Sequence, residues 1–311
     1  MGCERVRVAV VDMGSNSTRL LIADVVDGSI EELDRRSIVT RLGEGVDATG
    51  RLGDEPQRRV FAALDEFVRA IEAHGCGRRL AVMTSAVRDA ANGVGFAAAV
   101  HDRHGLDGRT LSGDEEARLT YRGATAERAG GAPLLVVDIG GGSTELVTGE
   151  RGEMDFHVST QAGVVRHTER HLHADPPAGP EMDALARDVR AMFAAAVPAE
   201  VRERVRGAVA VAGTATSCAA IDLALEPYDA ARVEGHVLSA GRLAELRARL
   251  ATLPLAERRE VPGLHPDRAP TIVAGTILLG EVLAAFGLGE FEVSERDILW
   301  GVALDGAAPQ S

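Results

Sequence analysis

Two short stretches of this chain combine residue types that can hold a phosphate group and a divalent cation. In residues 136–146, Asp138 closes an apolar run and is followed at once by a glycine-rich turn. Glycine amides are not shielded by side chains, so an anion can approach them closely, and adjacent hydroxyls add further donors. The candidate phosphate-binding residues of this stretch are Gly140, Gly141, Gly142, Ser143 and Thr144. The alternative is a tight hairpin whose glycines serve turn geometry alone.

A second copy of the stretch favours the phosphate-binding interpretation. Residues 10–20 match residues 136–146 at seven of eleven positions, and the two aspartates, Asp12 and Asp138, are 126 residues apart. The matching phosphate-binding candidates are Gly14, Ser15, Asn16 and Ser17. Residues 80–86 and 209–215 also correspond, each as a short strand that runs into a turn of small residues. The sequence therefore predicts a duplicated α/β unit whose halves face one another across a cleft.

The composition narrows the class of protein. Apolar residues make up 45% and charged residues 26% of the 311 positions, which is typical of a soluble globular protein. The net charge of −13 opposes binding of nucleic acid, and an aromatic content of 3% offers few stacking surfaces for bases. No apolar run reaches the roughly 18 residues that span a bilayer, and the N-terminus lacks a signal-peptide core. We therefore expect a cytoplasmic protein with no membrane contact.

The elements that must position these residues follow from local patterns. Residues 6–12 and 18–26 are predicted to form a hairpin, with a third strand over 38–42. Ser112 and Glu115 form a capping box that begins a helix. A hinge at 128–133 is expected to separate a first domain, 1–128, from a second domain, 129–311. In the second domain, His171 and His173 are expected in a loop, as exposed polar residues rather than metal ligands.

Taken together, these segments resemble the exopolyphosphatase and guanosine-pentaphosphate phosphohydrolase family. The resemblance rests on the two loops, residues 84–92, Ser112 to Ala117 and the closing 293–295, and it covers nearly the whole chain. It implies two ribonuclease-H-like domains of the actin-like ATPase superfamily around an active-site cleft. Some longer members carry a further helical region, whose absence here favours short substrates. Pro270 departs from the family, which usually has an aspartate there.

Cleavage of a terminal phosphoanhydride needs charge neutralisation, a positioned water and a base. Asp12 and Asp138 would hold Mg²⁺, which takes only one or two carboxylates. The resemblance implies that Glu116 is the general base. Glu116 could instead simply favour the positive end of its helix, as Glu115 would do equally well.

Two further residues have candidate roles with open alternatives. Glu145 could share the catalytic water or bind metal, or it could be a surface residue of a strand. Arg88 resembles a family arginine near the phosphates, where a guanidinium would neutralise transition-state charge. Its alternative is an ion pair on a helix surface with Asp89 or another neighbour.

The resulting prediction is a Mg²⁺-dependent exopolyphosphatase acting on short inorganic polyphosphate. Hydrolysis of guanosine pentaphosphate (pppGpp) is the nearest alternative, because both substrates end in a terminal anhydride. A kinase of the superfamily is a third enzyme hypothesis, against which Glu116 argues because it would activate water. A sensor that binds a phosphorylated alarmone without turnover is a hypothesis from another class. The resemblance also implies a homodimer, although no stretch of the sequence identifies its interface.

Overall fold

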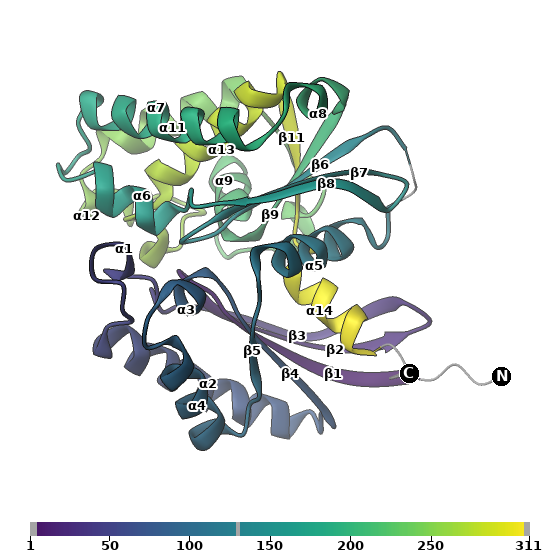
Figure 1. Cartoon of the computed structure of the whole chain (residues 1–311). Coiled ribbons are helices and arrows are strands. Elements are labelled where there is room, and N and C mark those ends of the chain that lie inside the picture. The colour runs from purple at the N-terminus through teal and green to yellow at the C-terminus, as the bar shows by residue number, and fades with distance from the viewer. Residues whose placement is uncertain (1–4, 129–130, 308–311) are drawn as a thin grey trace. The chain divides into compact units, whose positions relative to one another are not determined.

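The computed structural model describes residues 5–128 and 131–307, and these form two compact units (Figure 1). Unit 1 contains the described residues up to Arg128 together with those from Asp297 onward. Unit 2 covers the described residues between them, up to Arg296. Residues 129 and 130 of the expected hinge lie outside the described residues. Each unit consists of one β-sheet with helices packed against it.

Unit 1 is built on a five-stranded sheet with the order β3-β2-β1-β4-β5. Strands β1, β2 and β3 pair antiparallel in succession, whereas β4 pairs parallel to β1, and β5 parallel to β4. The strands are β1 (Arg5–Met13), β2 (Ser17–Val26), β3 (Ser29–Val39), β4 (Arg78–Met83) and β5 (Gly108–Thr110). The carboxyl end of β1, which carries Asp12, therefore lies beside the carboxyl end of β4.

Helices cover both faces of this sheet, which explains why β1 is an almost continuous apolar run. Ala9, Val11 and Met13 pack into a core with α2 and α4, while Val8 and Val10 pack into a second core with α5 and α14. Figure 1 shows these two pairs of helices on opposite sides of the strands. The helices are α1 (Val46–Thr49), α2 (Asp54–Ala73), α3 (Ser85–Asp89), α4 (Gly93–His104), α5 (Gly113–Thr125) and α14 (Ile298–Ala307).

Unit 2 is built on a six-stranded sheet with the order β10-β11-β9-β6-β7-β8. Strands β6, β7 and β8 form an antiparallel meander, and β9 pairs parallel to β6. Strand β11 pairs parallel to β9, and β10 is an antiparallel edge strand. The strands are β6 (Leu134–Ile139), β7 (Thr144–Glu150), β8 (Glu153–Thr160), β9 (Gly207–Val211), β10 (Val237–Ser239) and β11 (Glu290–Ser294).

The helices of unit 2 share one large core with its sheet. Leu135, Val137 and Ile139 of β6 lie in this core together with Phe193 of α7 and Leu278 of α13. Helix α13 is buried along most of its length, because other helices pack around it. The helices are α6 (Val164–His171), α7 (Gly179–Ala196), α8 (Ala199–Arg204), α9 (Ala212–Asp222), α10 (Ala230–Val233), α11 (Ala240–Thr252), α12 (Leu255–Arg258) and α13 (Ile272–Phe286), with a 3₁₀ turn at Pro266–Arg268.

The two units repeat one plan. In each, an antiparallel three-stranded meander adds a parallel strand beside its first strand, in the orders β3-β2-β1-β4 and β8-β7-β6-β9. Asp12 is opposite Arg19 in the first hairpin, and Asp138 is opposite Glu145 in the second. The predicted α/β class and its internal duplication are confirmed by this correspondence.

The last helix corrects the predicted extent of the second domain, because α14 packs in unit 1 and not with the residues that precede it. The backbones of α5 and α14 touch at two glycines. A Cβ at Gly301 would lie 1.8 Å from the Leu119 carbonyl oxygen, and one at Gly123 would lie 2.0 Å from the Asp297 carbonyl oxygen. This contact joins segments that are far apart in the sequence, so no local pattern reports it.

The predicted third strand was also misplaced, since β3 covers Ser29–Val39 instead of residues 38–42. Most of β3 is exposed or half-buried and many of its residues are charged, so its sequence lacks a strong apolar signal.

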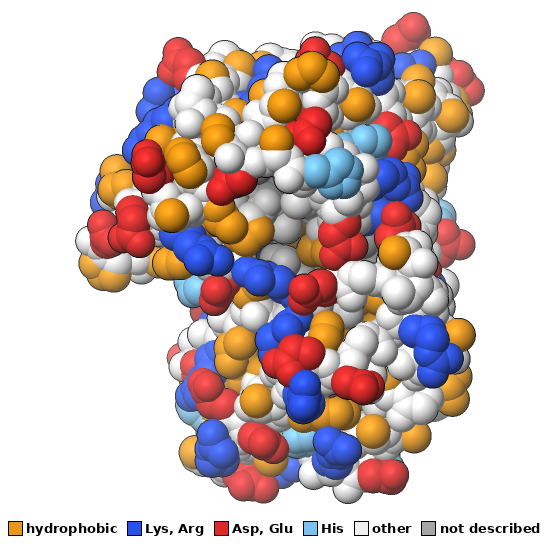
Figure 2. All heavy atoms as spheres, turned by 90° about the vertical axis from the view of Figure 1, so that its left-hand side faces the viewer, with side chains coloured by type: hydrophobic (Ala, Val, Ile, Leu, Met, Phe, Trp, Pro, Cys, Tyr) orange, Lys and Arg blue, Asp and Glu red, His pale blue; other side chains and the backbone are white. Residues whose placement is uncertain are grey.

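Within residues 5–128 and 131–307, no helix combines the length and apolar character needed to cross a membrane. On the face seen in Figure 2, acidic and basic side chains are interspersed.

Candidate active site

The first candidate phosphate loop is the turn between β1 and β2. The Gly14 amide donates to the Ser17 carbonyl at 3.0 Å, which closes the turn. The Ser15 hydroxyl is buried, accepts a hydrogen bond from the Ala86 amide at 3.1 Å and lies 2.8 Å from the Ser85 hydroxyl. It therefore fixes the loop to the start of α3, and its contact with phosphate stays a prediction.

Asn16 anchors the same loop through its backbone and leaves its side-chain oxygen unsatisfied. Its carbonyl accepts hydrogen bonds from the amides of Thr40 at 3.0 Å and Arg41 at 2.8 Å. Its Oδ1 atom is buried and has no hydrogen-bond partner among the described residues. Buried polar atoms without partners are rare in proteins and often mark a place for water or a ligand. The loop is thus rigidly held while one of its polar groups remains available.

Asp12 lies at the end of β1 with 2% of its surface exposed. Its Oδ2 atom accepts hydrogen bonds from Arg19 Nε at 3.0 Å and Nη2 at 2.6 Å across the hairpin. Its Oδ1 atom is buried and has no hydrogen-bond partner in the described part of the chain. Burial raises the pKa of Asp12 above its usual value, and the charge of Arg19 opposes this shift.

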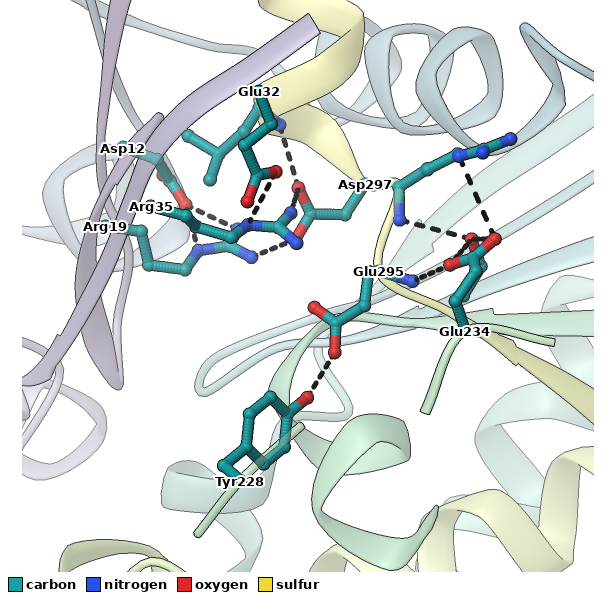
Figure 3. A network of polar contacts seen from close by, with 11 residues as sticks. Asp12, Arg19, Glu32, Arg35, Tyr228, Glu234, Glu295 and Asp297 are labelled. Atoms are coloured by element: carbon teal, nitrogen blue, oxygen red, sulfur yellow. Dashed lines mark hydrogen bonds and ion pairs between the residues drawn. The ribbon is translucent and has the colours of Figure 1, made fainter. Parts of the chain in front are cut away.

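Arg19 joins Asp12 to a third segment of unit 1, as Figure 3 shows. Its Nη1 atom donates to Asp297 Oδ2, and Arg35 Nη2 lies 3.9 Å from the other oxygen of Asp297. Asp297 is buried, and its Oδ1 accepts a hydrogen bond from the Leu299 amide at 3.0 Å, which caps α14. The last helix of the chain is therefore tied through one guanidinium to the aspartate that precedes the first loop.

The residues at the end of β1 fit a bound cation. A carboxylate oxygen that is buried without a partner is costly, and a divalent ion or one of its waters would satisfy Asp12 Oδ1. Mg²⁺ keeps several waters and needs few carboxylates, so a single free oxygen on Asp12 is compatible with it. Asp138, at the equivalent position in unit 2, is also buried.

Glu116 and Arg88, which the sequence analysis treated separately, form an ion pair. Arg88 Nη1 lies 3.0 Å from Glu116 Oε2 and donates to the Leu111 carbonyl at 2.8 Å. Glu116 is only 7% exposed although it is charged and lies in the first turn of α5. Under the helix-surface alternative, Arg88 was expected to pair with Asp89 or another neighbour. In the structure, Arg88 contacts the candidate base, Glu116.

Glu115 has a different task from Glu116. Its carboxylate accepts a hydrogen bond from the Ser112 amide at 2.9 Å, and the Ser112 hydroxyl accepts one from the Glu115 amide at 3.2 Å. This capping box confirms the predicted start of the helix. The hydrogen bond from the Ser112 amide, more than any other contact, lowers the pKa of Glu115. The capping role is thus filled by Glu115, which leaves Glu116 for another purpose.

The second candidate phosphate loop is held by the first turn of α6. The Val164 amide donates to the Gly140 carbonyl at 3.0 Å, and the Val165 amide donates to the Gly141 carbonyl at 2.9 Å. Arg166 Nε donates to the Gly142 carbonyl at 3.0 Å. In a planar trans peptide the N–H points opposite to the C=O. The amides of the residues that follow these carbonyls, up to Ser143, therefore point away from α6, as an anion-binding loop requires.

Gly163 allows this close approach. A Cβ at Gly163 would lie 2.3 Å from the Gly141 carbonyl oxygen and 2.3 Å from the Gly142 carbonyl carbon. The Gly140 amide donates to the Ser143 carbonyl at 3.0 Å, which is the same closure as that of Gly14 and Ser17 in the first loop. The two turns therefore share their backbone hydrogen bond, in addition to their sequence.

The hydroxyl of Thr144 has a structural partner. It donates to the Ala162 carbonyl, and the residue is fully buried at the start of β7. A hydroxyl has one proton to donate, so this contact uses the donor that the sequence analysis assigned to phosphate. Thr144 thus joins β7 to the segment that leads into α6.

We expect Thr144→Val to lower the free energy of unfolding by about 1–3 kcal/mol, because it leaves the Ala162 carbonyl without its donor. Thr144→Ser keeps the hydroxyl and should lose much less. Chemical denaturation gives the stability, and steady-state kinetics should show nearly unchanged KM for the valine variant. A large rise in KM without loss of stability would instead assign the hydroxyl to phosphate.

Glu145 is not the surface residue that one alternative proposed, since it is only 1% exposed. The Ser159 hydroxyl of β8 donates to Glu145 Oε1 at 2.7 Å. Glu145 is directly opposite Asp138 in the hairpin, so two buried carboxylates occupy neighbouring strands at the base of the second loop. Like charges on paired residues disfavour ionisation of both, and a bound cation would relieve this repulsion.

The first turn of α9, which follows β9 directly, is covered by an arginine. A Cβ at Gly213 would lie 1.8 Å from Arg268 Nη1, and the Thr214 hydroxyl donates to the Ile139 carbonyl at 3.0 Å. The guanidinium of Arg268 thus packs directly on the Gly213 backbone.

Sequence reasoning missed several residues that complete these arrangements. Arg19 could have been found, because a hairpin that turns at residues 14–17 pairs position 12 with position 19. Asp297 was predicted only as a cap of the last helix, and its pairing with Arg19 gave no signal because the two residues are 278 positions apart. Gly163 and Ser159 also gave none, because their importance depends on how α6 and β8 approach the second loop.

The fold and these loops define a class of protein. Two α/β units with one shared plan, each with a phosphate-type loop at the tip of its first hairpin, are the two-domain arrangement of the actin-like ATPase fold. A solved structure of a Ppx/GppA family member from Aquifex aeolicus has a TM-score of 0.80 and 30% identity, covering 97% of both chains. An exopolyphosphatase from Cytophaga hutchinsonii has a TM-score of 0.87 and 25% identity, covering 98% of this chain and 100% of that one.

The family follows from the sequence comparisons. The model of the Ppx/GppA phosphatase family matches residues 21–307, and this chain belongs to that family. A relative named exopolyphosphatase 2, from Mycobacterium tuberculosis, is 39% identical over 312 aligned positions, covering 96% of this chain and 98% of the relative. Exopolyphosphatase 1 of Mycobacterium bovis is 31% identical, covering 96% of this chain and 87% of the relative. The family resemblance found in the sequence is therefore confirmed.

Proposed function

We propose that this chain is a Mg²⁺-dependent exopolyphosphatase that releases orthophosphate from the ends of short inorganic polyphosphate chains. The observation that carries the proposal is the buried Glu116, paired with Arg88 and released from helix capping by Glu115. A buried carboxylate beside a guanidinium can accept a proton from water while the cation offsets charge on a phosphate. The names of the relatives in two mycobacteria support the same substrate class.

The reaction can be written with residues of this chain. Glu116 accepts a proton from water as the water oxygen bonds to the terminal phosphorus, and the anhydride P–O bond breaks toward the shortened chain. Arg88 offsets charge on the transferred phosphoryl group. The amides of the two glycine loops, around Gly14 and Gly141, bind phosphate oxygens. Mg²⁺, for which Asp12 and Asp138 are the proposed ligands, would neutralise further charge.

The net negative charge of the protein favours short polyphosphate chains as substrates. The net charge of −13 repels a polyanion more strongly as the number of its phosphates increases. Salt screens this repulsion, with a Debye length of about 10 Å at 0.1 M ionic strength. Discrimination against long chains should therefore weaken as the salt concentration rises.

The test compares substrates at equal concentrations of chain ends. Phosphate release is measured from polyphosphates of increasing length and from pppGpp, with Mg²⁺ and again with excess chelator. We expect the highest kcat/KM with short polyphosphate and no turnover without the metal. A higher kcat/KM for pppGpp would favour the alternative hydrolase. Binding of these compounds without any turnover would favour the alarmone sensor.

We also propose that the protein acts in the cytoplasm, as a homodimer. Cys76 and Cys218 are buried free thiols, which suits a reducing compartment. Burial raises the pKa of Cys218 to about 12, so this thiol is unreactive. Light scattering coupled to size-exclusion chromatography tests the dimer, and a monomeric mass across the working concentration range would reject it.

A further inference from the structure

A cluster of two histidines and an aspartate lies between α6 and α7 in unit 2. His167 and His171 are one helical turn apart on α6, and Asp188 comes from α7. Their ligand atoms lie within 4.8 Å of one another. Asp188 Oδ2 is 2.9 Å from His171 Nε2 and 3.6 Å from His167 Nε2. His171 was predicted from the sequence to be an exposed loop residue, but it ends α6 with a side chain only 17% exposed.

The orientation of His167 is fixed. Its Nδ1 atom lies 3.1 Å from the Gly163 carbonyl oxygen, which can only accept, so Nδ1 carries the proton of the neutral ring. The ring is completely buried, and burial favours an uncharged ring. In that form Nε2 presents a lone pair. Such a carbonyl contact is the usual way in which proteins orient a metal-binding histidine.

The lone pair on His167 Nε2 meets no hydrogen-bond donor among the described residues. His167 Nε2 is buried and has no hydrogen-bond partner within residues 5–128 and 131–307. It faces the Asp188 carboxylate, which is also an acceptor, and a cation between the two atoms would satisfy both. Arg170 Nη1 lies 3.6 Å from Asp188 Oδ2, but its side chain is 40% exposed and can turn to solvent.

We propose that His167 Nε2, His171 Nε2 and Asp188 Oδ2 bind a divalent transition metal, with Zn²⁺ as the best fit. Zn²⁺ is usually tetrahedral with bonds of about 2.0–2.1 Å to nitrogen and about 2.0–2.2 Å to oxygen, which places its ligand atoms about 3.4 Å apart. The distances from Asp188 Oδ2 to His171 Nε2 and His167 Nε2, which are 2.9 and 3.6 Å, lie on either side of that value. Water supplies the fourth ligand. Imidazole donors select against Mg²⁺, which prefers oxygen, so this site is distinct from the one proposed at Asp12 and Asp138.

The proposed metal would act on the second phosphate loop through α6. The first turn of α6 holds the loop by the amides of Val164 and Val165, and the last turn carries His171. A metal that joins α6 to α7 would fix the helix at its far end. The effect is structural, so binding should raise the melting temperature without being required for each turnover.

Binding is tested on full-length protein stripped with a chelator and then supplied with excess Mg²⁺, which occupies oxygen-rich sites. Titration with Zn²⁺ should give one ion per chain and a higher melting temperature, and Co²⁺ should give the visible absorption of a tetrahedral site. His171→Ala and Asp188→Asn, which change half-buried side chains, should each weaken Zn²⁺ binding by at least about 10-fold.

The matched control is His173→Ala, because His173 is an exposed histidine two residues from His171. It should bind Zn²⁺ as the wild type does. Zn²⁺ affinity that is unchanged in both His171→Ala and Asp188→Asn, or equally reduced in His173→Ala, would overturn the proposal. Circular dichroism in the absence of Zn²⁺ shows whether each variant is folded, so that loss of binding can be read as loss of ligands.

Discussion

Replacement of Glu116 by glutamine should lower kcat for polyphosphate by at least about 10²-fold, as expected for the loss of a general base. The amide has nearly the same shape and can still accept a hydrogen bond from Arg88, so substrate affinity should be largely kept. Such a pattern would show that the carboxylate acts in the transition state and not in binding. Single-turnover kinetics and equilibrium binding of a non-hydrolysed analogue measure the two quantities separately.

Glu115→Gln is the matched control, because it changes the neighbouring carboxylate in the same turn of α5. Glu115 belongs to the capping box, in which glutamine can replace glutamate, so the variant loses only a negative charge near the helix N-terminus, worth about 0.3–1 kcal/mol. The control should therefore lose little stability and keep its kcat. Unchanged turnover in Glu116→Gln would remove this residue from the mechanism, and with it the observation on which the proposed function depends.

The second large effect is expected on stability. Arg19→Met should lower the free energy of unfolding by about 3–5 kcal/mol, because it leaves buried carboxylates without their cation. Asp12 loses both of its hydrogen bonds from Arg19, and Asp297 retains the Leu299 amide and the more distant Arg35. Methionine keeps the apolar length of the side chain, so a cavity is not the cause. Denaturant unfolding with excess chelator present measures the loss without interference from bound metal.

The stability lost in Arg19→Met should depend on pH in a direction that the pKa of Asp12 determines. Burial already raises the pKa of Asp12 in the folded protein, and removal of Arg19 removes the charge that opposes this shift. A carboxyl group with a raised folded-state pKa favours the folded state at low pH and loses this contribution as pH rises. The deficit of Arg19→Met should thus be largest near neutral pH and smaller toward pH of about 4, near the pKa of an unfolded aspartate.

Arg36→Met is the control for this experiment. Arg36 pairs with Asp34 and Glu66 in unit 1, and its side chain is 34% exposed, so its partners remain in contact with water. Surface ion pairs contribute about 0–1 kcal/mol, and the control should lose no more than that. Equal losses in Arg19→Met and Arg36→Met would show that the charge network around Asp12 is not a special feature of the fold.

Much of the fold could be predicted from local patterns. The hairpins were found because a strand, a glycine-containing turn and a second strand are adjacent in sequence, and their repetition identified the duplication. The capping box at Ser112 and Glu115 depends only on residues within one helical turn, so it too could be predicted. The third strand of unit 1 was misplaced because β3 is polar and lies at the sheet edge, where alternation of apolar residues is weak.

Only part of the candidate site could be predicted from local sequence patterns. The types and order of Asp12, Glu116 and Asp138 indicated phosphate and metal chemistry. Their partners were not indicated, because an ion pair such as that of Arg88 and Glu116 depends on how α3 and α5 approach one another. The same holds for Thr144, whose hydroxyl was assigned to phosphate until the structure showed its bond to Ala162.

The amino-acid sequence alone thus determined the family, the doubled α/β plan and the two glycine-containing loops that we propose to hold phosphate, since each is specified by short segments with strong backbone preferences. Tertiary structure alone decided that α14 belongs to unit 1, that Arg19 joins Asp12 to Asp297, and that His167 faces Asp188. These contacts depend on the packing of whole helices and on strand register, and both are set by the burial of a core that no short segment encodes.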